Sequence, residues 1–277
     1  RRAAVRGRVK RPQAVYVDGV ALWTPLLSGW AIAAPALRGE PVAPREPERA
    51  AGACLAANER RRAPEGVKLA LDVAAAAVAA SGHEARTLPS VFASAHADLA
   101  IVDALCDTLA ADPLLLSPTR FHHSVHNAAS GYWAIASGCT APSSAVAADR
   151  HSFAAGWIEA ATLMAAEQHP VLLVGFDTEA CGRLQAVNDS RGLLGVALVL
   201  SPRAGPRSTH ALRWQLHAAG EAGPPAATTP LRSAAALALA GNAMADALPL
   251  MELLAGARPG RVQLALGGGG ALGLTRE

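Results

Sequence analysis

The stretch APSSAVAADRHSFAAGWIEAA (residues 141–161), followed by VLLVGFDTE (171–179), decides the fold class of this chain. Within it, residues 144–148 predict a short strand. Residues 152–167 carry apolar side chains at helical spacing and predict a helix, and the continuous apolar run at 171–176 is typical of a fully buried strand. A strand, a helix and a second strand in this order indicate an α/β domain.

The same alternation extends outward in both directions. Further strands are predicted at residues 15–20, 90–94, 193–201 and 262–266, and helical patterns at 65–80, 98–110 and 233–255. Asp98 is the expected cap of the helix at 98–110. We expect a basic leader at residues 1–13, a main domain at 14–204 and a reduced C-terminal portion at 205–277.

Composition excludes several classes of protein. Hydrophobic residues make up 51% and charged residues 17%, which argues against a disordered chain. Charged residues, Gly or Pro interrupt every apolar run well before the roughly 20 residues that a membrane-spanning helix needs. The four Cys are scattered without a CxxC pair, so neither a zinc site nor a disulfide framework is indicated, and no cofactor is expected. These features predict a soluble, cytoplasmic protein.

The net charge of +3 arises from a local excess of basic residues at the N-terminus. Six basic side chains lie within residues 1–11, before the first acid, Asp18. An arm that binds nucleic acid is one interpretation. No recognition helix follows, however, and the aromatic content of 4% leaves little for base stacking. An unstructured leader, with no nucleic-acid partner, is the interpretation we adopt.

Several segments, in order and with matching spacing, resemble the N-terminal half of β-ketoacyl synthases, enzymes of the thiolase fold. They are VYVDGVALWTPL (15–26), VFASAHADL (91–99), SVHNAASGYWAIASG (124–138), the stretch at 141–161 and VLLVGFDTE (171–179). The resemblance covers about residues 15–200. It implies a thiolase-like α/β fold with a complete N-terminal half, the main domain at 14–204, and an abbreviated C-terminal half.

The resemblance also shows where the chain departs from catalytic members. In the family the nucleophilic Cys lies eight residues after the Pro that matches Pro142, and that position holds Arg150 here. A Cys suits this place because a helix N-terminus favours the thiolate. A guanidinium is neither a nucleophile nor able to lose its proton. Cys139 precedes Pro142 and cannot reach the position in this register, so we expect no catalytic residue.

A second departure is length, since only about 75 residues follow Pro202 and no His-Gly-Thr-Gly segment occurs among them. Both departures resemble the short, Cys-less chain-length factors, closest to those of aryl polyene and xanthomonadin-type pigment pathways. The resemblance implies a non-catalytic subunit that pairs with a catalytic ketosynthase and shapes its acyl tunnel. The implied substrate is a polyene chain growing on acyl carrier protein.

The same resemblance suggests roles for particular residues. An interface strand within residues 124–148 would contact the partner, through Ser124, Asn127, Tyr132, Trp133 and Ile135. One stripe of the helix at 98–110 would line the tunnel, through Leu99, Val102, Leu105 and Cys106. Because a thiolase half-sheet buries its second face against the other half, we also expect an uncovered apolar face and hence a dimer.

Three other interpretations stay open. His122, His123 and His126 could form a metal site, but no Cys, Asp or Glu lies near them in the sequence, so no metal is expected. Ser152 and His151 could serve an acyltransferase or a thioester hydrolase, although GxSxG is absent and Ser152 also fits a helix cap. The chain could finally be a scaffold that binds acyl carrier protein without a ketosynthase.

Overall fold

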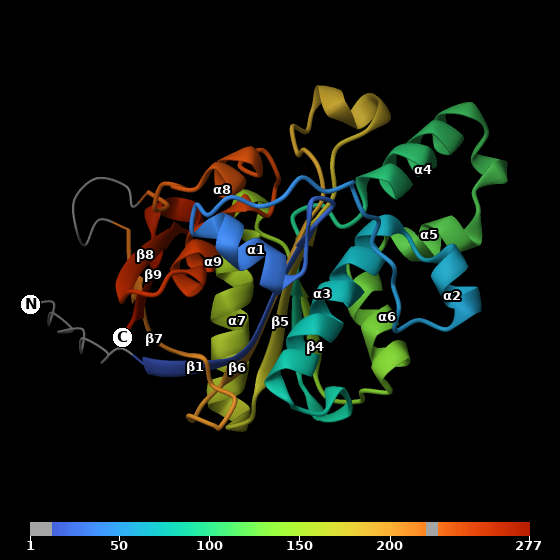
Figure 1. Ribbon diagram of the computed structural model, residues 1–277. Helices are drawn as coiled ribbons and strands as arrows, with labels where there is room; N and C mark the ends of the chain where they lie inside the picture. Colours follow the sequence, from blue (N-terminus) through green and yellow to red (C-terminus); the bar gives the residue numbers. More distant parts are fainter. Residues whose placement is uncertain (1–12, 220–226) are drawn as a thin grey trace, which may run out of the picture.

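The computed structural model describes residues 13–219 and 227–277, so the expected leader lies, except for Gln13, outside the described residues. The described residues form one mixed nine-stranded sheet in the order β4-β3-β5-β6-β1-β7-β9-β8, with β2 paired to β1 (Figure 1). The strands are β1 (Gln13–Thr24), β2 (Leu27–Ser28), β3 (Ser90–Ala93), β4 (Ser143–Val146), β5 (Val171–Asp177), β6 (Leu194–Ser201), β7 (His210–His217), β8 (Gly260–Ala265) and β9 (Ala271–Arg276). β3 runs parallel to β4 and β5, and the other pairs are antiparallel.

Helices cover both faces of this sheet (Figure 1). They are α1 (Trp30–Leu37), α2 (Ala57–Arg62), α3 (Glu65–Ser81), α4 (Leu99–Ala111), α5 (Pro118–Ser124), α6 (Ala128–Ser137), α7 (Ser152–Glu167), α8 (Ala234–Ala238) and α9 (Leu248–Ala255). One apolar core lies between the sheet and α3 with α6, and a second between the sheet and α1, α7 and α9. The expectation of an uncovered sheet face is therefore wrong, because the C-terminal helix α9 helps to cover the second face.

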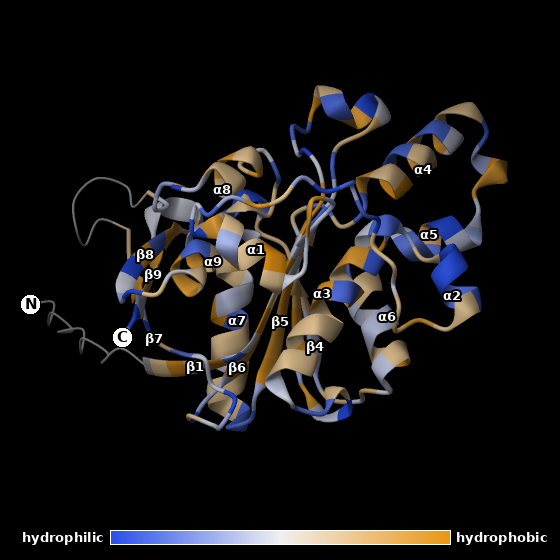
Figure 2. Ribbon diagram, viewed as in Figure 1, coloured by the Kyte–Doolittle hydropathy of each residue, from blue (hydrophilic) through white to orange (hydrophobic). Residues whose placement is uncertain are grey.

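The central strands explain why the sheet forms where the sequence predicts it. All residues of β5 and β6 are buried, and Figure 2 shows the central strands as predominantly hydrophobic ribbons between the helical layers. A strand buried on both faces needs a continuous apolar run rather than an alternating one. The predicted helices at residues 65–80, 98–110 and 152–167 are confirmed to within a residue at each end.

The C-terminal portion continues the same sheet. β7 pairs with β1, β9 with β7, and β8 closes that edge, while α9 packs on α1. The helical pattern predicted at residues 233–255 is broken into α8, a turn, a short 3₁₀ helix (Ala245–Ala247) and α9. Pro249 lies in the first turn of α9, where its missing N–H removes no helical hydrogen bond.

The segment that was expected to form the interface strand is helical. Residues 128–137 form α6, which ends at Gly138 in a left-handed conformation (φ 65°) whose N–H bonds to the carbonyl of Ala134. Ala and other helix-compatible residues dominate this stretch, and glycine accepts the positive φ of the helix end without strain. The strand at the sheet edge is instead β4, two residues shorter at its C-terminal end than predicted.

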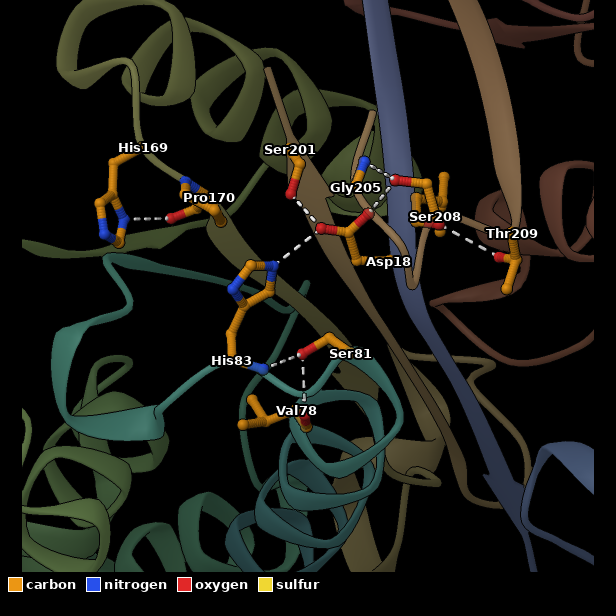
Figure 3. A network of polar contacts seen from close by, with 11 residues as sticks. Asp18, Val78, Ser81, His83, His169, Pro170, Ser201, Gly205, Ser208 and Thr209 are labelled. Carbon is orange, nitrogen blue, oxygen red and sulfur yellow. Dashed lines mark hydrogen bonds and ion pairs between the residues drawn. The ribbon is translucent and has the colours of Figure 1, made fainter. Parts of the chain in front are cut away.

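A buried carboxylate fixes the end of the sheet at which β6 ends and β5 begins (Figure 3). Asp18 lies at an irregularity in β1 and is 4% exposed. It accepts hydrogen bonds from the hydroxyls of Ser201 and Ser208, the latter at 2.6 Å, and contacts His83 Nε2 at 2.8 Å. The contacts join β1, β6, the segment that precedes β7 and the loop after α3, so this network is a structural tie between four parts of the chain.

Candidate functional site

The sharp turn between β4 and α7, which we call the elbow, holds the position at which the resemblance places the family nucleophile. A 3₁₀ turn (Asp149–His151) joins the strand to the helix, and Asp149 adopts a left-handed conformation with φ 49°. Aspartate tolerates this region better than most residues because its short side chain can bond locally. The backbone therefore turns abruptly at the residue before Arg150, and α7 begins at Ser152.

Arg150 is held by a distant acid rather than by its neighbour. Its guanidinium forms an ion pair with Asp189, in the segment between β5 and β6. The two side chains are 45% and 78% exposed, respectively, so the pair lies at the surface. Arg150 is therefore a surface cation with its own anionic partner. Its guanidinium cannot attack a thioester.

Ser152 is buried and its hydroxyl is fully engaged. The hydroxyl donates to the carbonyl oxygen of Asp149 (2.6 Å) and accepts from the amide of Ala148 (2.9 Å). Ser152 is the first helical residue rather than the cap, so the cap prediction is wrong. His151 Nδ1 is buried without a hydrogen-bond partner among the described residues, and no bond joins its ring to Ser152 there. The pair lacks the hydrogen bond through which a histidine activates serine.

The amino end of α7 receives a carboxylate from far along the chain. Asp246, in the 3₁₀ turn before α9, accepts a hydrogen bond from the amide of Ala154 at 3.2 Å. Burial raises the pKa of this carboxyl well above its usual value, and the charge of Asp177 adds to the increase. The amides of Phe153 and Ala154 oppose the increase. Asp246 Oδ1 has no partner among the described residues.

A second buried acid, Asp177, organises the ends of the neighbouring strands. It accepts hydrogen bonds from the hydroxyl of Ser94 (2.8 Å) and from the amides of Ala95 (2.8 Å) and His96 (3.0 Å). Burial raises its pKa, whereas these donors oppose the increase. Asn242 Nδ2 bonds the carbonyl oxygens of Asp177, Arg191 and Gly192 and thereby fixes the C-terminal segment against this network.

Beside the elbow lies a cavity of about 340 Å³. Its walls are formed by Arg150, His151, Thr228, Thr229, Pro230, Leu231, Ala240, Asn242, Ala243, Ala245, Asp246 and Pro249. None of these lining residues is a cysteine. Cys139 is buried elsewhere, with its Sγ 3.4 Å from the carbonyl oxygen of Leu88. The cavity offers polar groups for contact with a ligand but no thiol among its lining residues.

The histidine cluster is distributed among structural hydrogen bonds. His123 Nε2 lies 2.9 Å from the hydroxyl of Tyr132, and His126 Nε2 lies 2.7 Å from the carbonyl oxygen of Ser94. Burial lowers the pKa of His123. Among residues 13–219 and 227–277, no group of three or more His, Cys, Asp or Glu side chains could hold a metal ion.

The structure divides the predicted interface and tunnel residues into two kinds. Tyr132 and Trp133 are buried in the core beside α3, whereas Ile135 is 76% exposed. Asn127 is exposed, and the half-buried Ser124 donates its hydroxyl to the carbonyl of Phe121. On α4, Leu99 and Leu105 are buried and Val102 is half-buried, but Cys106 is exposed, so the predicted stripe is not continuous.

Five large apolar side chains on the segments from α4 to α6 are exposed. We call this set the apolar patch; it comprises Leu109, Leu114, Leu115, Phe121 and Ile135, with exposed fractions of 50%, 93%, 72%, 57% and 76%. They lie on α4, the turn after it, α5 and α6. Large apolar side chains exposed in this way are candidates for contact with another protein.

Sequence reasoning missed Asn242 and Asp246, the two residues that the C-terminal segment brings to the elbow. Their only local signal is a pair of polar residues within an otherwise apolar stretch, GNAMADALPL (241–250). Such residues have to find partners when they are buried, but the sequence does not say which.

Comparisons with solved structures show the same fold. The chain is 24% identical to a chain of the Xenorhabdus doucetiae complex of ketosynthase ApeO with its chain length factor ApeC, with a TM-score of 0.70 over 95% of this chain and 99% of that one. It is 16% identical to a chain of the ishigamide ketosynthase/chain length factor, with a TM-score of 0.73 over 95% and 99% of the two chains. No curated protein matches the sequence, and no helix in the described part of the chain is long and apolar enough to cross a membrane.

The model of one protein family matches most of the chain. It is described as the N-terminal domain of β-ketoacyl synthase, and it matches residues 34–247. That range contains the elbow, α7 and the buried acids Asp177 and Asp246. Together with the thiolase-like architecture, this match shows that the chain belongs to the β-ketoacyl synthase N-terminal-domain family.

Proposed function

We propose that the chain is a non-catalytic ketosynthase-like subunit, a chain-length factor, that pairs with a catalytic β-ketoacyl synthase. One observation carries the proposal: at the elbow the side chain is the Arg150 guanidinium, paired with Asp189, where a condensing enzyme needs a thiolate. A subunit without a nucleophile contributes to condensation by positioning the growing chain while its partner performs the chemistry.

The environment of Ser152 disfavours the alternative of an acyltransferase or thioester hydrolase. An attacking hydroxyl has to be accessible and bonded to a base, whereas this one is buried and bonded to two backbone groups. His151 makes no hydrogen bond to it within the described residues. The scaffold alternative differs from our proposal only in lacking a ketosynthase partner, and the association experiment below distinguishes the two.

Two neighbouring features support a ketosynthase as the partner. β4 is the edge strand of the sheet, paired on one side with β3, and its exposure alternates along the strand. An edge strand leaves backbone N–H and C=O groups available for pairing with another chain. The apolar patch adjoins it through α6, which contacts β4. The partner's equivalent edge and helices would cover both features.

The remaining partner and the substrate follow from the proposed role. Arg60, Arg61 and Arg62 are exposed on α2, and such a basic run suits an acyl carrier protein with an acidic surface. α4, with Leu99, Val102 and Leu105 on its inner side, is the proposed lining of the acyl or polyene tunnel. In this role the chain would work in the cytoplasm, in polyketide or fatty-acid-type synthesis such as that of aryl polyenes.

Reconstitution tests the absence of catalysis. The chain would be co-purified with a catalytic ketosynthase, and chain elongation on acyl carrier protein would be measured by mass spectrometry. We expect no elongation from the chain alone, and loss of elongation when the partner's nucleophilic Cys is replaced by Ala. Arg150→Ala and Ser152→Ala in this chain should retain more than about half of the activity per folded complex, since neither group performs a chemical step. Elongation or hydrolysis by the isolated chain, abolished by Ser152→Ala, would contradict the proposal.

Association with the partner is tested separately at the apolar patch. Ile135→Asp places a charge on its most exposed helical position next to β4, and we expect the dissociation constant to rise at least about tenfold, measured by analytical ultracentrifugation. Val187→Asp is the matched control, because Val187 is 83% exposed and lies outside the patch. Equal effects of the two variants, or full association of Ile135→Asp, would show that the partner binds elsewhere. Retention of acyl carrier protein without association of any ketosynthase would favour the scaffold.

A further inference from the structure

A second hollow borders the C-terminal segment, on the other side of the wall that it shares with the elbow cavity. It measures about 600 Å³, within the range of small-molecule sites, and it is bounded by α1, α9, β8 and the segment before α8. These elements lie together at the β8 end of the sheet (Figure 1), where α9 contacts both α1 and β8. We call it the basic hollow because of the side chains that line it.

Four arginines and a single acid are the charged residues among those that line the basic hollow: Arg38, Arg232, Arg258, Arg261 and Glu252. Glu252 is already occupied, since its carboxylate accepts hydrogen bonds from the amides of Arg232 and Ser233. Arg38 is paired with Glu40 and also donates to the carbonyl of Ala255. Arg232, Arg258 and Arg261 form no ion pair with any residue that the structure describes.

Two of these three guanidinium groups have neither an ion-pair nor a hydrogen-bond partner within the described residues. Arg261 Nη2 lies 3.1 Å from His217 Nε2, whereas no hydrogen bond is made by the guanidinium groups of Arg232 and Arg258 in that part of the chain. The side chains of Arg232, Arg258 and Arg261 are exposed and therefore hydrated, but like charges around one hollow repel one another, and a bound anion relieves that repulsion. Guanidinium groups bind phosphate through parallel N–H donors, so the chemistry that matches this lining is a multiply charged phosphate.

The walls are firm enough to hold a ligand in a defined position. The amide of Gln263 donates to Thr229 Oγ1 (2.8 Å), and that of Thr229 to the carbonyl of Gln263 (2.7 Å), so the segment before α8 is attached to β8. On the other side Arg276, 7% exposed, donates to the carbonyl oxygens of Leu253 (2.7 Å) and Gly256 and fixes the end of α9. Leu253 and Val262 add apolar surface to the lining.

We propose that the basic hollow is a binding site for a phosphorylated small molecule, whose phosphate groups contact Arg232, Arg258 and Arg261 and whose apolar part lies against Leu253 and Val262. The site is distinct from the elbow cavity, although the two share Thr229, Pro230 and Pro249 in their walls. The site requires no catalytic residue and no partner subunit, so its test does not depend on the function proposed above.

Isothermal titration of the full chain tests the proposal with three probes. Inorganic pyrophosphate presents the phosphate charge alone, ADP adds a nucleoside whose base can pack against Leu253 and Val262, and adenosine presents the nucleoside without charge. We expect pyrophosphate and ADP to bind, ADP more tightly, and adenosine to give no measurable heat. Raising the salt from about 0.05 to about 0.5 M should weaken both anions, because ions screen charge–charge attraction. Absence of heat with both anions, or binding of adenosine as tight as that of ADP, would overturn the site.

A charge-matched pair of variants separates a built site from diffuse attraction. The double variant Arg232→Gln with Arg258→Gln should raise the dissociation constant of ADP at least about tenfold, since it removes two guanidinium contacts. The control, Arg60→Gln with Arg61→Gln on α2, removes the same charge outside the hollow and should change it less than about twofold. Equal weakening by the two pairs would mean that the anion is drawn only by net charge, and the proposal would fail. Circular dichroism of both variants verifies that they are folded.

Discussion

The helices α4 and α7 both begin just after a strand of the parallel part of the sheet, but their amino ends are stabilised in different ways. α4 is capped by its own Asp98, whose Oδ1 accepts from the amide of Ile101 at 3.1 Å. α7 has no side-chain cap of its own, and its amide of Ala154 donates to Asp246, 92 residues away. One end is completed locally, and the other only when the C-terminal segment folds against it.

This difference shows how the chain accommodates a cation at the amino end of α7. The amino end of α7 is positive, so the cation Arg150 beside it is unfavourable. Asp189 offsets this by pairing with the guanidinium, and Asp246 accepts a hydrogen bond from an amide at this end of the helix. At the amino end of α4 there is no such cation, and the preceding residue Asp98 caps the helix by itself.

The largest effect is expected at the local cap. Asp98→Ala removes the acceptor for Ile101 and also for the amide of Gly66 in α3, which Asp98 Oδ2 accepts at 3.0 Å. We expect the free energy of unfolding to fall by about 3 kcal/mol, the sum of a lost cap and of an amide left buried without a partner. Urea denaturation measures it. Asp98→Asn keeps an acceptor and should lose less than half as much; an equal loss would show that charge, not capping, governs α4.

A smaller, pH-dependent effect is expected at the remote cap. Because burial raises the pKa of Asp246, the folded chain binds more protons than the unfolded chain above an unfolded carboxyl pKa of about 3.9. This carboxyl therefore destabilises the fold increasingly as the pH rises from 4 toward its raised pKa. Asp246→Asn does not titrate, so its stability relative to wild type should increase over that interval, by at most about 1.4 kcal/mol per pH unit.

The measurement is a series of urea unfolding curves between about pH 4 and pH 8. Asp149→Asn is the matched control, because Asp149 lies at the same elbow but is exposed. Its curve should run parallel to that of wild type. A difference between Asp246→Asn and wild type that does not vary with pH would show that this carboxyl is not buried in its neutral form.

The smallest effect is expected at Arg150. The ion pair with Asp189 joins two exposed side chains, and such pairs contribute little in water. Arg150→Ala should therefore change the free energy of unfolding by less than about 0.5 kcal/mol in the same assay. A loss several times larger would mean that the Arg150 guanidinium stabilises the elbow by more than a surface ion pair does. The contrast between the amino ends of α4 and α7 would then have to be revised.

Much of the central architecture could be predicted from local patterns. The strands at 171–176 and 193–201 are confirmed nearly to the residue, because a strand that is buried on both faces has to be apolar throughout. The helix at residues 152–167 is confirmed because its buried apolar side chains recur at helical spacing. Asp98 as a cap is also confirmed. The prediction of an interface strand in this region is wrong, because residues 128–137 are compatible with a helix and Gly138 ends it in a left-handed conformation.

The site was predicted less completely. The resemblance placed Arg150 at the position of the family nucleophile, which stays a prediction; its partner Asp189 could not be predicted, because exposed charges leave no periodic signal. Cys106 shows the limit of a helical stripe: its spacing matches Leu99 and Val102, yet α4 turns this position toward solvent. Asp246 and Asn242 gave no usable signal, since each is buried by contacts made far along the chain.

By itself the sequence determined the identity of the central strands and helices and the absence of a thiol from the elbow, because both depend on residue type and short-range spacing. Only the tertiary structure decided that Asp246 completes α7, that the C-terminal strands extend the sheet and that arginines from separate segments surround one hollow. These features depend on which distant segments meet, and that is set by the packing of apolar surfaces over the whole chain rather than by any one stretch of it.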